Sequence, residues 1–242
     1  MDNRLYIANS QIVFSFRRNL EIRKRIFEFE DALKDEFKIP FRAFAIPDDI
    51  DPNIPRFESQ SLHSHSRIKV SQTRIIFATK YNDQFKLNYK QVENYIENKF
   101  NLISKLTESE KMNFVAYIVE LGIHMNEKEL NPFIKKNTGV FAINDTCRDF
   151  SLLYSKEYKS DFYLNIKYSK FVEQEMKLHE ESKSFRPTGN IKHGISVVLD
   201  INSKPFFDKN KKFDTSLNGK IKEEVFQIIN LKRIEDYLKG EI

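Results

Sequence analysis

The sequence predicts an α+β protein, in which a ferredoxin-like βαββαβ unit is followed by an antiparallel β module and a C-terminal helix. Hydrophobic residues alternate with period two in the segments predicted as strands, and they recur at helical spacing in the segments predicted as helices. Over the first half of the chain these segments follow one another in the order βαββαβ. A folded core is expected, because 40% of the residues are hydrophobic and 22 of them are phenylalanine.

The first unit, residues 1–125, is predicted to begin with a strand over Leu5–Phe16, whose second half alternates cleanly between apolar and other residues. Helical spacing starts at Leu20, with Asn19 as the N-cap, and ends before Pro40. We expect this helix and a second one to pack their apolar sides on a single face of the sheet. The residues expected in that core are Ile22, Ile26, Phe29, Leu33, Val92 and Ile96.

A hairpin, a second helix and a fourth strand complete this unit. The proline-studded stretch 46–55 is predicted to be a loop. Arg56–Val70 and Arg74–Tyr81 are then predicted to be the two strands of a hairpin. Asn88, with a glutamine three residues later, is typical of a capped helix start. The continuous apolar run Phe114–Val119 predicts a strand that is buried on both faces.

Residues 126–242 are predicted to form the second module, packed with the first as one compact body. A short helical stretch interrupted by proline is expected within Glu127–Thr138. The tail Lys220–Lys239 returns to helical spacing and predicts the closing helix. The strands expected between them are Asp149–Tyr158, Phe162–Glu173 and Lys192–Ile201.

The composition limits the kinds of partner and compartment. The chain carries 40 Lys and Arg against 35 Asp and Glu, and its net charge of +5 is compatible with a polyanionic partner. No apolar run reaches the length that crosses a bilayer, and the first residues lack the pattern of a secretory signal. Cys147 is the only cysteine, which excludes an intrachain disulfide. We therefore expect a cytoplasmic protein without a membrane or a cofactor.

The region before position 70 comes nearest to a functional pattern. If it is one strand, period two places His63, His65, Arg67 and Lys69 on one face, where such a row would contact phosphates. The alternative is the solvated face of an antiparallel sheet, which alternation alone produces. A second basic stretch interleaves lysines with phenylalanines that would stack on bases, or that fold back onto the core. The candidate nucleic-acid-binding residues are His63, His65, Arg67, Lys69, Arg74, Lys80, Lys209, Lys211 and Lys212.

Metal chemistry has two places in this sequence, and neither predicts a site. His63 and His65 would converge on a metal ion, but no third ligand is nearby and the basic side chains that follow would repel a cation. Asp48, Asp49 and Asp51 form a loose nuclease-like cluster, yet the prolines around them place them in a loop. Motifs of nucleotide hydrolysis, dinucleotide binding, serine hydrolysis and zinc proteolysis are absent from the sequence. No catalytic residue is assigned.

Three segments carry a family resemblance: the hairpin stretch Ser66–Phe77, the strand end Asp200–Asn202 and the closing helix. Their layout resembles a sporadically distributed, functionally uncharacterised family of prokaryotic proteins of similar length. Several of its members are associated with mobile elements or anti-phage defence loci. Where such relatives carry a second acidic residue, this chain has Asn202. The family has no established catalytic residue, so the resemblance implies none here.

Two hypotheses of function follow. The first is a non-enzymatic accessory or sensing protein of a prokaryotic anti-phage defence or mobile-element system, which binds a protein partner or a nucleic acid. The second is a nuclease that depends on a metal ion or on the pair His63 and His65. The sequence does not define the oligomeric state.

Overall fold

Nine strands form one antiparallel sheet in the described part of the chain, which comprises residues 5–63, 65–138, 149–179, 183–209 and 216–229 of a computed structural model. The strands are β1 (Leu5–Phe16), β2 (Arg42–Ala43), β3 (Pro55–Gln60), β4 (Ser66–Ser71), β5 (Arg74–Lys80), β6 (Met112–His124), β7 (Ser151–Tyr158), β8 (Phe162–His179) and β9 (Ser184–Asn202). Their spatial order is β2-β3-β4-β5-β1-β6-β9-β8-β7. The chain is thus a mixed protein of α-helices and β-strands that is built on one large sheet.

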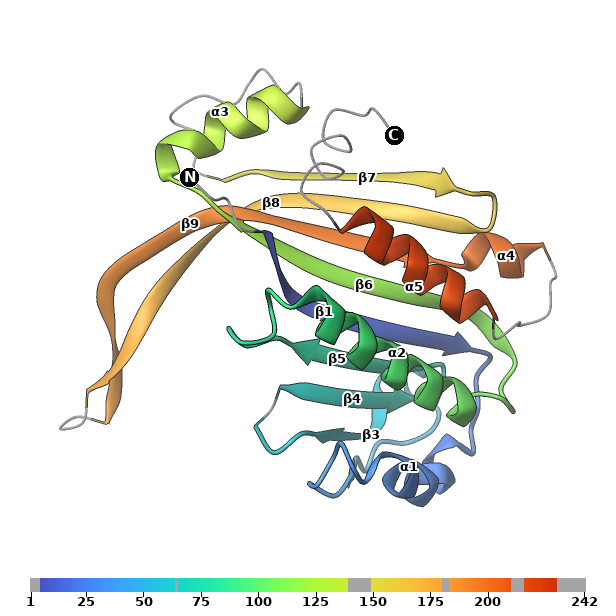
Figure 1. Ribbon diagram of the computed structural model, residues 1–242. Coiled ribbons are helices and arrows are strands. Elements are labelled where there is room, and N and C mark those ends of the chain that lie inside the picture. Colours follow the sequence, from blue (N-terminus) through green and yellow to red (C-terminus); the bar gives the residue numbers. More distant parts are fainter. Residues whose placement is uncertain (1–4, 64, 139–148, 180–182, 210–215, 230–242) are drawn as a thin grey trace.

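The helices are α1 (Ile26–Leu33), which follows a short 3-10 turn η1 (Ile22–Arg25), then α2 (Tyr89–Leu106), α3 (Glu127–Thr138), α4 (Lys204–Asp208) and α5 (Ser216–Ile228). Figure 1 shows α1, α2 and α5 on the same face of the sheet. None of the helices within the described ranges is long and apolar enough to cross a membrane.

Helix α2 forms as its sequence predicts. The Asn88 side chain accepts a hydrogen bond from the backbone N–H of Gln91 at 3.2 Å, and this contact satisfies one of the open donors of the first turn. The apolar side of α2 packs on the sheet, where the Phe100 ring lies 5.2 Å from that of Phe14 on β1 and 6.4 Å from that of Tyr117 on β6. The expected core residues Ile22, Phe29, Leu33, Val92 and Ile96 are all buried, whereas Ile26 is only partly buried.

The first helix is shorter than the sequence pattern predicts. The backbone turns as a 3-10 helix through Ile22–Arg25 before α1 begins, and α1 ends at Leu33 although Phe37 is buried beyond it. Asn19 does not cap α1. Its side-chain oxygen instead accepts from the backbone N–H of Glu21 at 2.8 Å, in the turn that leaves β1.

The strand expected over Arg56–Val70 is two strands, β3 and β4, and described residues 61–63 and 65 lie in a turn between them. The prediction of one strand is wrong because two serines close the turn. The Ser66 N–H donates to the Ser61 hydroxyl at 3.0 Å, and the Ser61 N–H donates to the Ser66 carbonyl at 2.9 Å. The hairpin of β4 and β5 is confirmed, with Ile68 opposite Phe77.

The second half of the chain extends the sheet of the first half, because β6 pairs with β9 from Ala116–Asn202 to His124–Gly194. The expected strands, the short helix α3 and a closing helix are present. The closing helix covers Ser216–Ile228, and the expected continuation beyond residue 229 lies outside the described residues, as does Cys147.

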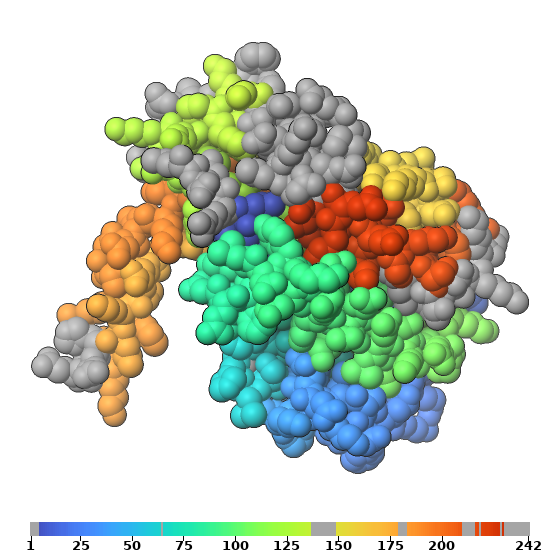
Figure 2. Space-filling model, in the orientation of Figure 1, coloured from blue at the N-terminus to red at the C-terminus, as the bar shows by residue number. Residues whose placement is uncertain are grey.

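β8 and β9 are much longer than the sequence pattern predicts, and their far ends form a two-stranded arm. The arm extends from the sheet and stands away from the body of the molecule (Figures 1 and 2). It carries exposed apolar side chains at Val172, Met176, Leu178, Phe185 and Ile191. These side chains do not face a core, so the arm lacks the alternation of apolar and polar residues that predicts a half-buried strand.

Candidate functional site

Four cationic residues share the outer face of the β4–β5 hairpin, which is the face turned away from the core under α2. On β4, Arg67 and Lys69 lie on the face opposite buried Ile68. On β5, Arg74 and Lys80 lie on the face opposite buried Phe77. The register pairs Arg67 with Ala78 and Lys69 with Ile76. We call the four residues the basic row: Arg67, Lys69, Arg74 and Lys80. Arg67 and Lys69 lie on one face, as the alternation predicts, and the role of the basic row stays a prediction.

The members of the basic row differ in their partners. Arg67 forms an ion pair with Glu58 at 2.5 Å, and Glu58 forms a second ion pair with Arg42 at 2.8 Å. Within the described ranges, Lys69, Arg74 and Lys80 have no carboxylate within 4.0 Å. Three of the four charges are therefore uncompensated by a local ion pair.

His63 and His65 do not belong to this row. They lie in the turn between β3 and β4, because the strand expected there breaks at residue 61. Both are exposed, with ring centroids 6.4 Å apart. Both line a cavity of about 350 Å³ between this turn, the end of β5 and the start of α2.

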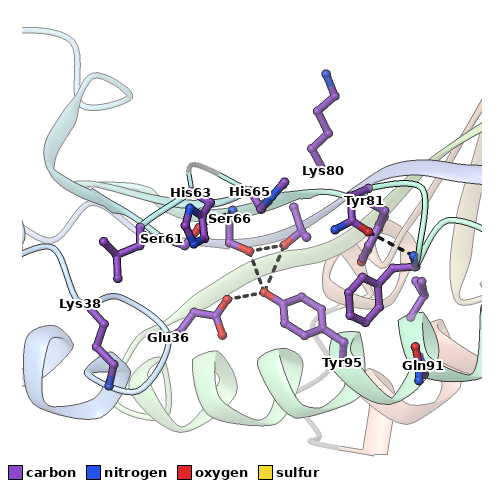
Figure 3. A pocket seen from close by; sticks show the side chains of 15 residues that line it. Glu36, Lys38, Ser61, His63, His65, Ser66, Lys80, Tyr81, Gln91 and Tyr95 are labelled. Carbon is purple, nitrogen blue, oxygen red and sulfur yellow. Dashed lines mark hydrogen bonds between the residues drawn. The ribbon is translucent and has the colours of Figure 1, made fainter.

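This space, the hairpin cavity, has a polar floor (Figure 3). Ser66 Oγ lies 2.7 Å from the Tyr95 hydroxyl and 3.1 Å from the Thr79 hydroxyl. The Tyr95 hydroxyl donates to Glu36 Oε1 at 2.6 Å, and Lys99 Nζ lies 2.6 Å from the other carboxylate oxygen of Glu36. Lys80 is at the rim, and Figure 3 shows its side chain pointing away from Tyr95 and Glu36.

The ionisation of the floor follows from these contacts. Burial disfavours the charged form of Glu36, but hydrogen bonds from Lys99 and Tyr95 outweigh it, so the pKa of Glu36 lies below its ordinary value. Burial raises the pKa of Tyr95, and its hydrogen bond to Glu36 raises it further. At neutral pH the floor therefore presents a carboxylate, already matched by Lys99, and neutral hydroxyls.

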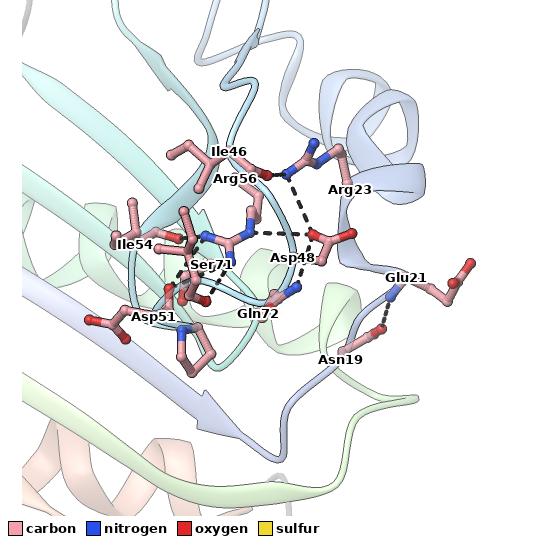
Figure 4. A network of polar contacts seen from close by, with 12 residues as sticks. Asn19, Glu21, Arg23, Ile46, Asp48, Asp51, Ile54, Arg56, Ser71 and Gln72 are labelled. Carbon is pink, nitrogen blue, oxygen red and sulfur yellow. Dashed lines mark hydrogen bonds and ion pairs between the residues drawn. The ribbon is translucent and has the colours of Figure 1, made fainter.

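The aspartate cluster is part of a structural network (Figure 4). Asp48 accepts from Gln72 Nε2 at 3.0 Å and lies 3.5 Å from Arg23 and 3.6 Å from Arg56. The Asp51 carboxylate accepts from the backbone and side chain of Asn53, both at 2.9 Å. The stretch is a loop as predicted, and its carboxylates hold the loop in place. Among the described residues, no three His, Cys, Asp or Glu side chains are grouped so as to hold a metal ion.

The second basic stretch begins with the short helix α4, whose Phe206 and Phe207 pack against the core. This placement agrees with phenylalanines that fold back onto the protein. The Lys209 ammonium donates to the backbone carbonyl of Ser160 at 2.6 Å. Lys211 and Lys212 lie outside the described residues.

One cluster, around His124, was not expected from the sequence. His124 Nε2 lies 3.1 Å from Glu173 Oε2, and the Tyr6 hydroxyl lies 3.3 Å from both side chains. These residues come from β6, β8 and β1, so no local spacing could have grouped them. Likewise, His193 lies 3.8 Å from Glu127, and Asp200 accepts from Asn165 at 3.0 Å.

Comparison of the sequence with protein-family models finds no match, and comparison with curated proteins finds none either. The basic row and the hairpin cavity are therefore the basis for assigning a function.

Proposed function

We propose that this chain is a non-enzymatic accessory or sensing protein that binds nucleic acid through the outer face of the β4–β5 hairpin. The observation that carries the proposal is the alignment of Lys69, Arg74 and Lys80 on that face with no carboxylate within 4.0 Å among the described residues. When a protein cation binds a phosphate, counterions are released from the nucleic acid. A cation that has no ion-pair partner binds a phosphate without first breaking an ion pair, so these three residues contribute most to binding.

The spacing of the row fits a phosphate backbone. Arg74 and Lys80 are the first and last residues of β5, which corresponds to about 20 Å of extended strand. That length spans several phosphates of one nucleic-acid strand. Half-buried Ile76 and Ala78 lie between the cations, so the face has no acidic side chain of its own on β5.

The setting that we propose, a prokaryotic anti-phage defence or mobile-element system, rests on the family resemblance of the segment Ser66–Phe77. The basic row lies mostly within that segment. The resemblance and the chemistry of the hairpin therefore point to the same surface.

The test is fluorescence-anisotropy binding of single- and double-stranded oligonucleotides over a series of salt concentrations. The triple variant Lys69→Ala, Arg74→Ala, Lys80→Ala should bind more weakly and lower the log–log salt slope for single strands by about 2, at about 0.7 for each phosphate that is no longer neutralised. Arg67→Ala should have a smaller effect, because its charge is already paired with Glu58.

A matched control removes the same charge elsewhere. Lys24, Lys34 and Lys90 are exposed, and each is within 4.0 Å of an acidic residue three positions away along the chain. Their triple alanine variant should leave the salt slope close to that of the wild type. Equal losses in both triple variants would mean that binding follows net charge, which would contradict a site on the hairpin.

A protein partner is the second candidate, and the β8–β9 arm favours it. Leu178 pairs with Phe185 and Met176 with Pro187 in the arm, so one side of its tip is apolar. Exposed apolar patches of this kind are typical of interaction sites. If the wild-type chain binds no oligonucleotide at low salt, the nucleic-acid proposal fails and the arm becomes the surface to pursue. The nuclease hypothesis has less support, because Asp48 and Asp51 are engaged in the loop network.

We also propose that residues 4–124 are a ferredoxin-like unit with an added edge. In support, β6, β1, β5 and β4 are neighbours in that order, and β4 and β5 form the hairpin between the two helices α1 and α2. β2 and β3 precede β4 and extend the sheet beyond it. This insertion is the departure from a plain βαββαβ arrangement.

A further inference from the structure

The mouth of the hairpin cavity is framed by side chains that suit a flat ring. His63 and His65 lie in the turn on one side, with an angle of 58° between their ring planes. Phe85 and Leu62 also line the cavity, and they are 44% and 65% exposed. Large apolar and aromatic side chains at a cavity mouth gain contact area when a planar ligand covers them. In the described part of the chain, neither imidazole makes a hydrogen bond through its side chain.

The floor of the cavity offers polar groups rather than charge. The hydroxyls of Ser66, Thr79 and Tyr95 line it and are joined by hydrogen bonds of 2.7 to 3.5 Å. Hydroxyls rotate and both donate and accept, so they adapt to the edge of a heteroaromatic ring. Glu36 does not attract a cationic ligand, because Lys99 and Tyr95 occupy its two oxygens.

Two lysines line the cavity in addition to Glu36, and one of them, Lys38, lies 3.9 Å from Asp35. Lys38 and Lys80 both line the cavity, and both are exposed. From the floor outward, a ligand would thus meet polar hydroxyls first and then the apolar and aromatic side chains of the mouth. The volume of about 350 Å³ is at the lower end of small-molecule pockets, which span about 300 to 1,000 Å³.

We propose that the hairpin cavity takes one nucleobase, with the sugar and phosphate outside it. This inference rests on the proposed function in one respect, since Lys80 belongs to both the basic row and the rim of the cavity. The base comes either from a free nucleotide or from one unstacked position of a strand held by the basic row.

The experiment uses the full chain and two fluorescent probes. One probe is 2-aminopurine riboside monophosphate, and the other is a single-stranded oligonucleotide with one 2-aminopurine. Binding in the cavity should change the 2-aminopurine emission at saturation. The double variant His63→Ala, Phe85→Ala should weaken monophosphate binding about 5- to 100-fold, the loss expected when an aromatic stacking partner is removed.

Phe27→Ala is the matched control, because Phe27 is an exposed phenylalanine on α1 that does not line the cavity. It should leave the emission and the affinity of both probes unchanged. His63 and Phe85 are exposed outside regular elements, so the double variant should keep the melting temperature of the wild type.

The outcomes separate this inference from the proposed function. Oligonucleotide binding without any change in emission, and without monophosphate binding, overturns the cavity inference and leaves the basic row. Monophosphate binding that the double variant loses, without oligonucleotide binding, keeps the cavity and assigns its ligand to free nucleotides. Binding of neither probe overturns both. Both probes could also change their emission on binding. If Phe27→Ala alters these changes as much as the double variant does, the assignment to this cavity is overturned.

Discussion

Replacing Arg56 by methionine should destabilise the fold, although arginine is rarely a core residue. The Arg56 side chain is 0% exposed and is enclosed by the proline-rich loop of residues 46–55, called the connector below. Its guanidinium donates to the backbone carbonyls of Ile54 at 2.8 Å and Ile50 at 3.3 Å, and Nε lies 3.6 Å from Asp48. Methionine keeps the apolar stem of the side chain but leaves these carbonyls without their donor.

The magnitude follows from the partners. A hydrogen bond from a charged group contributes about 1.5 to 3 kcal/mol, so the two shorter carbonyl contacts together are worth about 3 kcal/mol or more. The Asp48 side chain is 52% exposed, so the ion pair itself adds little. For a chain of this size, about 3 kcal/mol lowers the melting temperature by roughly 6 to 12 °C.

The assay is urea and thermal unfolding of the full chain, followed by circular dichroism. Arg67→Met is the matched control, because Arg67 is 47% exposed and makes its ion pair at the surface. It should cost less than about 1 kcal/mol. The reasoning is refuted if Arg56→Met unfolds within about 1 kcal/mol of the wild type, or if both variants lose the same stability.

Two further changes test the floor of the cavity and the sheet. Because hydrogen bonds hold the folded-state pKa of Glu36 below its ordinary 4.5, its carboxylate contributes stability above that pH, and the contribution is lost as the pH falls through the folded pKa. Glu36→Gln should therefore be less stable than the wild type at neutral pH, with a gap that narrows in acid; a gap independent of pH contradicts this origin. Gly194→Ala should cost about 1 to 3 kcal/mol in urea unfolding, since a Cβ there would lie 2.5 Å from the Ile123 carbonyl oxygen and 2.3 Å from the Phe171 ring. Its control, Gly219→Ala in α5, meets nothing within 4 Å and should gain about 1 kcal/mol; an equal loss in both variants would contradict a steric origin at Gly194.

The elements that the sequence predicts well are those whose periodicity is set by one buried face. Helix α2 is an example, since its cap at Asn88 and its apolar stripe are both local signals. The alternation of Arg67 and Lys69 with Ile68 is another, because the core on one side forces the cations to the other. The predicted bounds of the helix from Leu20 were wrong at both ends, because the 3-10 turn at its start and the buried Phe37 beyond its end depend on packing with other elements.

The turn between β3 and β4 shows where local pattern misleads. Alternating polar residues continue the period of the strands on either side, so sequence alone favours one strand through His63 and His65. The two hydrogen bonds between Ser61 and Ser66 close a turn there, so a single continuous strand does not form. As a result the histidines leave the basic row and reach the hairpin cavity.

By itself, the sequence determined the α+β class, the order of the main elements and the two-sided character of the β4–β5 hairpin, because each follows from the spacing of apolar residues along a short segment. Only the tertiary structure decided which distant side chains meet. It placed Tyr6 beside His124 and Glu173, Glu36 beside Tyr95, and Arg56 inside the connector. It also joined both halves of the chain through β6 and β9. Contacts between segments so far apart arise from strand order and helix packing, and neither leaves a periodic trace in the sequence.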